Sequence, residues 1–129
     1  MRPFRYVAGE RRPVEILIFD VDPDHLEEWL VADHEIWTLG ECSMPGLDRI
    51  PFLSKEVWLD DGRPGEVWVV IEWPDLDAWD RIDDAQFQRR LTEAFRERFP
   101  HRSELVRAIH HERDRGLHRW SRFEPTGGT

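Results

Sequence analysis

The sequence has very little cysteine, and it has no long apolar run. Cys42 is the only cysteine among 129 residues, so the chain forms no internal disulfide, as is typical of a protein in a reducing compartment. No apolar run approaches the roughly 20 residues that span a bilayer. The arginine-rich start, residues 1–13, is not followed by an apolar block with a cleavage site. We therefore expect a cytoplasmic protein that is not associated with a membrane.

Lysine is also scarce, and acidic residues outnumber basic ones by 27 to 18. The net charge is −9, and Lys55 is the only lysine. Nucleic-acid binding needs a basic surface, so this charge balance argues against it. A glycine-rich phosphate loop and a serine nucleophile elbow are both missing from the sequence, which disfavours nucleotide chemistry and serine hydrolysis.

Apolar residues are plentiful and arranged for a sheet. They make up 40% of the chain and include 7 Trp and 7 Phe, which indicates a packed globular domain. Residues 14–19 and 67–73 read as strands that are apolar on both faces, because successive side chains alternate between the two sides. Such a sheet needs a cover on each face, but the predicted helices suffice for only one. We expect a second copy of the chain, in a homodimer, to provide the other cover.

The predicted elements follow the order β-α-β-β-α-β. The expected strands are at 14–20, 52–59, 67–73 and 104–113. The expected helices run from 22 to about 39, from 76 to 82, and from 83 to about 100. This order is the α+β, ferredoxin-like pattern of a four-stranded antiparallel sheet with its helices on one face. We expect residues 1–13 to form an N-terminal arm, 14–113 the domain, and 114–129 a C-terminal tail. The tail either docks on the dimer partner through Trp120 and Phe123 or is disordered.

Residues that are common at helix caps mark the ends of the predicted helices. Asp22 and Asp75 are predicted N-caps, and Asp83 with Gln86 resembles a capping box. Gly40 is predicted to end the first helix.

Several strings resemble, in order, a small bacterial family without an assigned activity. They are Asp-His-Glu-Ile-Trp-Thr at 33–38, Pro-Gly at 45–46, Phe-Leu-Ser-Lys-Glu-Val-Trp at 52–58 and Val-Ile-Glu-Trp at 70–73. That family resembles the dimeric α/β-barrel superfamily, which includes the antibiotic-biosynthesis monooxygenases. The resemblance covers about residues 14–113, and residues 47–51 are an insertion that could border a pocket. It implies a small-molecule pocket between sheet and helices, used for cofactor-free oxygenation, haem chemistry or simple binding. No superfamily catalytic motif is matched, so no residue role is carried over.

Asp33 is the candidate catalytic residue. It falls within the apolar stripe of the first helix, seven residues after Leu26 and four before Trp37. A carboxyl group buried among aromatic rings has a raised pKa, which suits a general base. The alternative is that Asp33 pairs with an arginine or caps a backbone group. His34 points about 100° away from Asp33 on an ideal helix, so a direct partnership between them is not expected.

The candidate pocket residues are aromatic or imidazole side chains. They are Trp29, His34, Trp37, Trp58, Trp73 and His111. Core and dimer packing explain the tryptophans equally well. Lys55 is expected to be solvated, with a Schiff-base nucleophile as the alternative.

No metal site is expected from the strand histidines. His110 and His111 are adjacent on the predicted last strand, so they point to opposite faces and cannot share one ion. No cofactor is required by the sequence, although haem held by His34 and a strand histidine is an alternative.

We therefore expect a small-molecule protein that holds an apolar or aromatic metabolite beside Asp33 and Trp37. If the protein is an enzyme, we expect a cofactor-independent, monooxygenase-like activity. The alternatives are a non-enzymatic interaction module, which a small cavity would favour, and a haem-binding protein.

Overall fold

The strands form one antiparallel sheet with an added ribbon. The computed structural model describes residues 3–112 and 115–126. Its strands are β1 (Phe4–Val21), β2 (Ser54–Leu59), β3 (Glu66–Glu72), β4 (Ser103–Ile109) and β5 (His118–Pro125). The main sheet has the order β2-β3-β1-β4, and β5 pairs with β1 outside this path. The predicted α+β, ferredoxin-like fold is confirmed.

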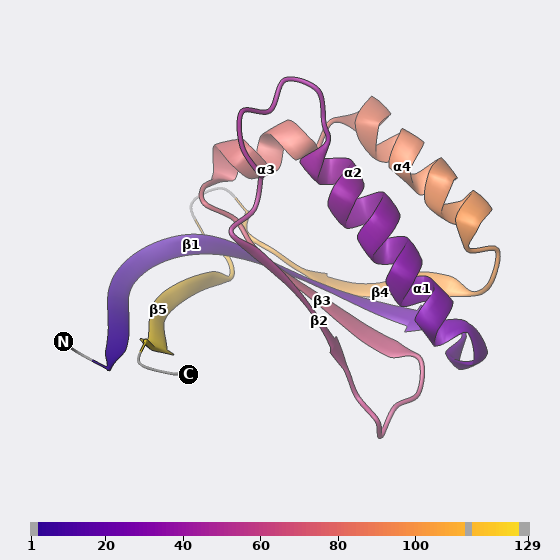
Figure 1. Cartoon of the computed structure of the whole chain (residues 1–129), viewed down its shortest axis with the longest axis horizontal. Coiled ribbons are helices and arrows are strands. Elements are labelled where there is room, and N and C mark those ends of the chain that lie inside the picture. The colour runs from indigo at the N-terminus through magenta and orange to yellow at the C-terminus, as the bar shows by residue number, and fades with distance from the viewer. Residues whose placement is uncertain (1–2, 113–114, 127–129) are drawn as a thin grey trace.

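The helices lie together on one face of the sheet (Figure 1). The first helical segment is nearly continuous and consists of η1 (Pro23–His25), α1 (Leu26–Ala32), the π-helical η2 (Asp33–Thr38) and α2 (Leu39–Cys42). The others are α3 (Leu76–Ile82) and α4 (Ala85–Arg98). The core lies between helices and sheet, where Val21, Trp29, Val67 and Trp73 are fully buried. Burying these apolar side chains is the main favourable term in folding.

Two of the predicted helix caps are confirmed, and one is wrong. The side chains of Asp22 and Asp75 accept backbone hydrogen bonds at the starts of η1 and α3. The capping box at Asp83 does not form, because Asp84 accepts the hydrogen bond from the Phe87 amide at 2.8 Å. Asp83 follows the last residue of α3 and closes that helix instead.

Gly40 does not end the first helical segment, which continues to Cys42. A Cβ atom on Gly40 would lie 2.8 Å from Cδ2 of Leu91 on α4. The missing side chain therefore permits the close approach of two helices.

The predicted arm and tail form a two-stranded ribbon. The first part of β1 pairs with β5, from Phe4 opposite Pro125 to Pro13 opposite His118. Figure 1 shows this ribbon curving away from the sheet. The stacked rings of Phe4 and Phe123, with centroids 5.0 Å apart, join its two strands. The sequence pattern missed this pairing because its two partners are separated by almost the whole chain.

An ion-pair cluster holds the base of the ribbon against the sheet. Arg119 on β5 donates hydrogen bonds to the buried carboxylate of Glu72 on β3 and, at 3.3 Å, to Glu10 on β1. Arg12 donates to Glu10 at 2.8 Å and to the backbone oxygen of Pro74 at 2.8 Å. These charge-assisted bonds fix the direction in which the ribbon leaves the sheet.

The last strand of the domain is shorter than predicted. β4 ends at Ile109, so His110 and His111 follow the strand. Arg113, the predicted end, lies outside the described residues.

Candidate functional site

A cavity of about 530 Å³ lies between the inner face of the sheet and the helices. The inner face of the sheet is set by strand alternation, because Glu15, Leu17 and Phe19 of β1 point to the same side. The walls combine apolar and ionisable side chains, including Glu15, Leu17, Phe19, Trp29, Asp33, Trp37, Glu41, Lys55, Val69, Ile71, Trp73, Trp79, Phe95 and His101. The volume is within the roughly 300–1,000 Å³ range of small-molecule sites.

Lys55 and Asp33 form a buried ion pair in this wall. The Lys55 ammonium donates to Asp33 Oδ2 at 2.8 Å and to Thr38 Oγ1 at 2.6 Å. The two charged side chains are only 10% and 8% exposed. The expectation of a solvated Lys55 is therefore wrong. Position 55 lies opposite Ile71 on β3 and so faces the helices.

The same lysine joins the two ends of an irregular helical segment. Asp33 is the first residue of the π-helical η2, and Thr38 is the last. Short π-helical segments are often found at functional sites. The single lysine thus connects β2 to the part of the helix that departs from regular geometry.

Two carboxyl groups that were not among the sequence candidates also line the cavity. Burial raises the pKa of Glu15 to about 7, although nearby His110, Trp73 and Lys55 oppose the shift. Burial also raises the pKa of Glu41 to about 7, and nearby Lys55 opposes this shift. Strand alternation already placed Glu15 on the inner face with Leu17, so the sequence contained this signal.

The aromatic part of the wall is formed by stacked indoles. The rings of Trp73 and Trp79 are nearly parallel, with an interplanar angle of 7° and centroids 5.4 Å apart. Nε1 of Trp73 is buried beside the Glu15 carboxyl, outside ideal hydrogen-bond geometry. Its interaction with Glu15 stabilises the carboxylate and so lowers the pKa of Glu15, against the larger effect of burial.

The structure brings four of the predicted site residues together. Asp33, Trp29, Trp37 and Trp73 all line the cavity. Nε1 of Trp29 is occupied, because it donates to Ser103 Oγ at 2.9 Å.

The other three predicted pocket residues lie elsewhere. His34 is exposed on η2, since a single helical step turns it away from Asp33. Trp58 is 49% exposed and lies on the outer face of β2, opposite Trp68. His111 follows the end of β4 and does not line the cavity.

The inserted loop borders a different, smaller depression. Four of its residues, Leu47, Asp48, Arg49 and Pro51, line a pocket of about 210 Å³ together with residues around the start of α3. The expectation that the insertion borders a pocket therefore holds for this depression and not for the main cavity. None of the helices in the described ranges has the length and apolar character needed to cross a membrane.

No family model and no curated protein sequence matches the chain. Solved structures share its fold at low identity. A conserved protein from Methanosarcina mazei matches with a TM-score of 0.52 and 12% identity, over 76% of this chain and 90% of that one.

Two further matches are provisionally named antibiotic biosynthesis monooxygenases. The protein from Caulobacter crescentus has a TM-score of 0.52 and 9% identity, over 92% of each chain. The protein from Bordetella bronchiseptica has a TM-score of 0.52 and 16% identity, over 81% of this chain and 98% of that one. The predicted resemblance to this superfamily is confirmed at the level of fold.

Proposed function

We propose that the cavity binds a small aromatic metabolite with a weakly acidic proton, and that Glu15 accepts this proton. The observation that carries the proposal is a carboxyl group with a pKa of about 7 in the wall of a cavity large enough for a metabolite. A general base is most effective when its pKa lies near the working pH. Glu15 also lies on the central strand β1, which holds it in a fixed position.

The surrounding side chains suit a flat ligand that gains negative charge. The stacked Trp73 and Trp79 offer an aromatic surface beside Glu15. An ammonium group has three donors. Asp33 and Thr38 accept two of those of Lys55. The third is available to an oxygen of the bound anion.

As an enzyme, the protein would oxygenate this aromatic ligand without a cofactor. An electron-rich aromatic anion can react with O₂ directly, so the protein needs to supply only a base, a dry cavity and a positive group. Asp33 was the sequence candidate for the base, but its ion pair with Lys55 gives it a structural role instead. Glu15 therefore replaces Asp33 in this role.

Oxygen uptake with quinol-type substrates tests the proposal. We expect kcat/KM to rise with pH and to level off above about pH 7, because Glu15 must be deprotonated to act. Glu15→Gln should lower kcat/KM by about 100-fold. The matched control is Glu93→Gln, which alters an exposed carboxylate on α4 outside the cavity and should leave the rate unchanged.

The outcomes separate the proposed enzyme from its alternative. Equal rates in wild type and Glu15→Gln would contradict the role of Glu15. Saturable quenching of tryptophan fluorescence without oxygen uptake would support the non-enzymatic alternative, a binding protein. The size of the cavity favours ligand binding over a purely structural module.

We also propose that the chain is a homodimer that joins the outer faces of two sheets. Trp58, Trp68 and Ile18 lie in one row across β2, β3 and β1. Val70 and Ile16 lie in a neighbouring row on the same face. Figure 1 shows the helices on the opposite face only. Trp58 is 49% exposed on this face, whereas Ile18 is buried within the chain. An apolar sheet face that is partly open to solvent favours association with an identical face.

Sedimentation velocity at low micromolar concentration tests the dimer. We expect a species of twice the chain mass of 15.5 kDa, and Trp68→Glu should convert it to a monomer because a charge at the centre of an apolar interface is costly. Val31→Glu is the control, since Val31 is 48% exposed on the helix side. A wild-type monomer under these conditions would contradict the proposal.

A further inference from the structure

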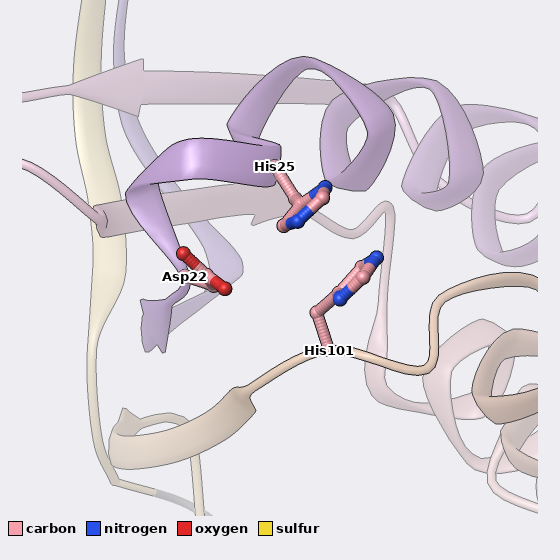
Figure 2. A group of neighbouring side chains, drawn as sticks. All are labelled: Asp22, His25 and His101. Carbon is pink, nitrogen blue, oxygen red and sulfur yellow. The ribbon is translucent and has the colours of Figure 1, made fainter.

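Three side chains with metal-binding atoms converge at the junction of β1 and η1. Asp22, His25 and His101 each place one potential ligand atom within 4.8 Å of the other two (Figure 2). Asp22 and His25 flank the start of the first helical segment, whereas His101 lies in the loop between α4 and β4. All three are partly buried. Because His101 is far from the others in sequence, spacing alone gives no indication of this cluster.

Backbone hydrogen bonds hold the two segments together. The amide of Asp22 donates to the carbonyl oxygen of Arg102 at 3.0 Å, directly beside His101. The amide of His25 donates to the carbonyl oxygen of Asp22 at 3.0 Å. The His101 ring also packs edge-on against Phe99, with centroids 5.2 Å apart. The main chain and an aromatic contact thus position the three side chains before any ligand binds, which lowers the entropic cost of binding.

The two imidazoles lie face to face. Their planes differ by 5° and their centroids are 3.5 Å apart. In Figure 2 both rings lie beside the carboxylate of Asp22. Neutral imidazole is the form that binds a metal ion.

Glu28 is suited to orient both rings. Its carboxylate lies 3.0 Å from His25 Nδ1 and 3.7 Å from His101 Nε2. These contacts leave His25 Nε2 and His101 Nδ1 as the ring nitrogens for a metal ion. Metal-binding histidines usually donate their other N–H to a carboxylate, which fixes the tautomer and the ring direction.

We propose that Asp22, His25 and His101 form a binding site for a divalent transition-metal ion of the Zn²⁺ type. Two imidazole nitrogens and one carboxylate oxygen favour such an ion over Mg²⁺ or Ca²⁺, which prefer oxygen ligands alone. A zinc ion lies in the plane of each imidazole that binds it, at about 2.0–2.1 Å from the nitrogen, so the two rings must rotate out of their parallel stack to bind one ion. Three protein ligands leave a position open for water or for a ligand atom.

The site lies beside the main cavity. His101 is both a member of the cluster and a lining residue of the cavity. A bound ion would therefore place a positive charge at the end of the cavity where His101 lies. Metal binding itself does not depend on proton transfer to Glu15, so the two proposals succeed or fail separately.

Calorimetric titration of the untagged protein with Zn²⁺ at neutral pH tests the site. We expect saturable binding of one Zn²⁺ ion per chain. Titration with Co²⁺ should produce a visible absorption band that saturates at the same ratio of one ion per chain. His101→Gln removes a ligand and should weaken binding by at least about 100-fold. Glu28→Gln removes only an orienting partner and should weaken it by about tenfold. His34→Gln, which alters an exposed histidine outside the cluster, should bind like wild type.

Thermal unfolding provides a second measurement. An ion that binds only the folded chain raises the melting temperature, so Zn²⁺ should stabilise wild type and His34→Gln but not His101→Gln. Similar melting temperatures without metal would show that the His101→Gln variant is folded. The proposal is overturned if wild type shows no saturable binding at micromolar Zn²⁺, or if His101→Gln binds as tightly as wild type. Either result would leave the cluster as a set of ion pairs centred on Glu28.

Discussion

The free energy of unfolding is expected to fall by several kcal/mol between about pH 4.5 and about pH 7. The cause is the pair of cavity carboxyls, Glu15 and Glu41, whose pKa values burial raises from 4.5 to about 7. Between these two values the folded chain binds more protons than the unfolded chain, so stability falls as the pH rises. A shift of this size corresponds to about 3 kcal/mol for each carboxyl, and contact with solvent reduces it. The stabilising effect is fully present below about pH 4.5 and lost above about pH 7.

Urea denaturation at a series of pH values measures this dependence. Glu15→Gln and Glu41→Gln should each flatten the decline, because a neutral amide cannot lose a proton. Glu93→Gln, which alters an exposed carboxylate on α4, should keep the wild-type slope. His25, whose pKa is raised by Glu28, also loses its stabilising contribution as the pH rises, so only the difference between variants identifies the cavity carboxyls. The double variant Glu15→Gln/Glu41→Gln should show the smallest pH dependence of the free energy of unfolding. The same pH dependence in wild type and in this double variant would refute the role of the two carboxyls.

Replacing Lys55 with methionine is expected to lower the free energy of unfolding by about 3–5 kcal/mol. The substitution leaves the carboxylate of Asp33, with a side chain only 8% exposed, without its positive partner. It also removes the hydrogen bond to Thr38 and thereby releases both ends of η2. Arg63→Met is the control, because it breaks an exposed contact with Glu66 and should cost less than about 1 kcal/mol.

A double-mutant cycle shows whether the loss arises from the ion pair. Asp33→Asn in the Lys55→Met background should cost much less than Asp33→Asn alone, because the charge that it removes is already unpaired. The coupling energy should be about 1–3 kcal/mol. Additive effects of the two substitutions would show that Lys55 and Asp33 stabilise the chain independently of each other.

The alternating pattern of apolar residues was sufficient to predict the main sheet. Val67, Val69 and Ile71 point to the helices, as strand periodicity requires, and the turn residues before Glu66 join β2 to β3. The ribbon could not be predicted in this way. Its two strands lie near opposite ends of the chain, and neither gives any local sign of its distant partner.

The sequence predicted the residues of the candidate site correctly where the geometry of a single helix sets the direction of each side chain. Helical spacing placed Trp29, Asp33 and Trp37 on a common face, and all three line the cavity. The charge state of the site depends on packing between elements. Lys55 is buried because a helix covers the inner face of β2, and this arrangement cannot be read from the residues near Lys55.

The π-helical geometry of η2 determines which groups beyond it face the cavity. Loss of one residue from this segment would rotate Glu41 about the helix axis by roughly 100° and carry its carboxyl out of the wall. A homologue with a regular helix here would keep the same architecture and still offer its ligand a different set of acids. Shared topology with the solved structures is therefore a poor guide to substrate preference, and residue-by-residue alignment across η2 is the more informative comparison.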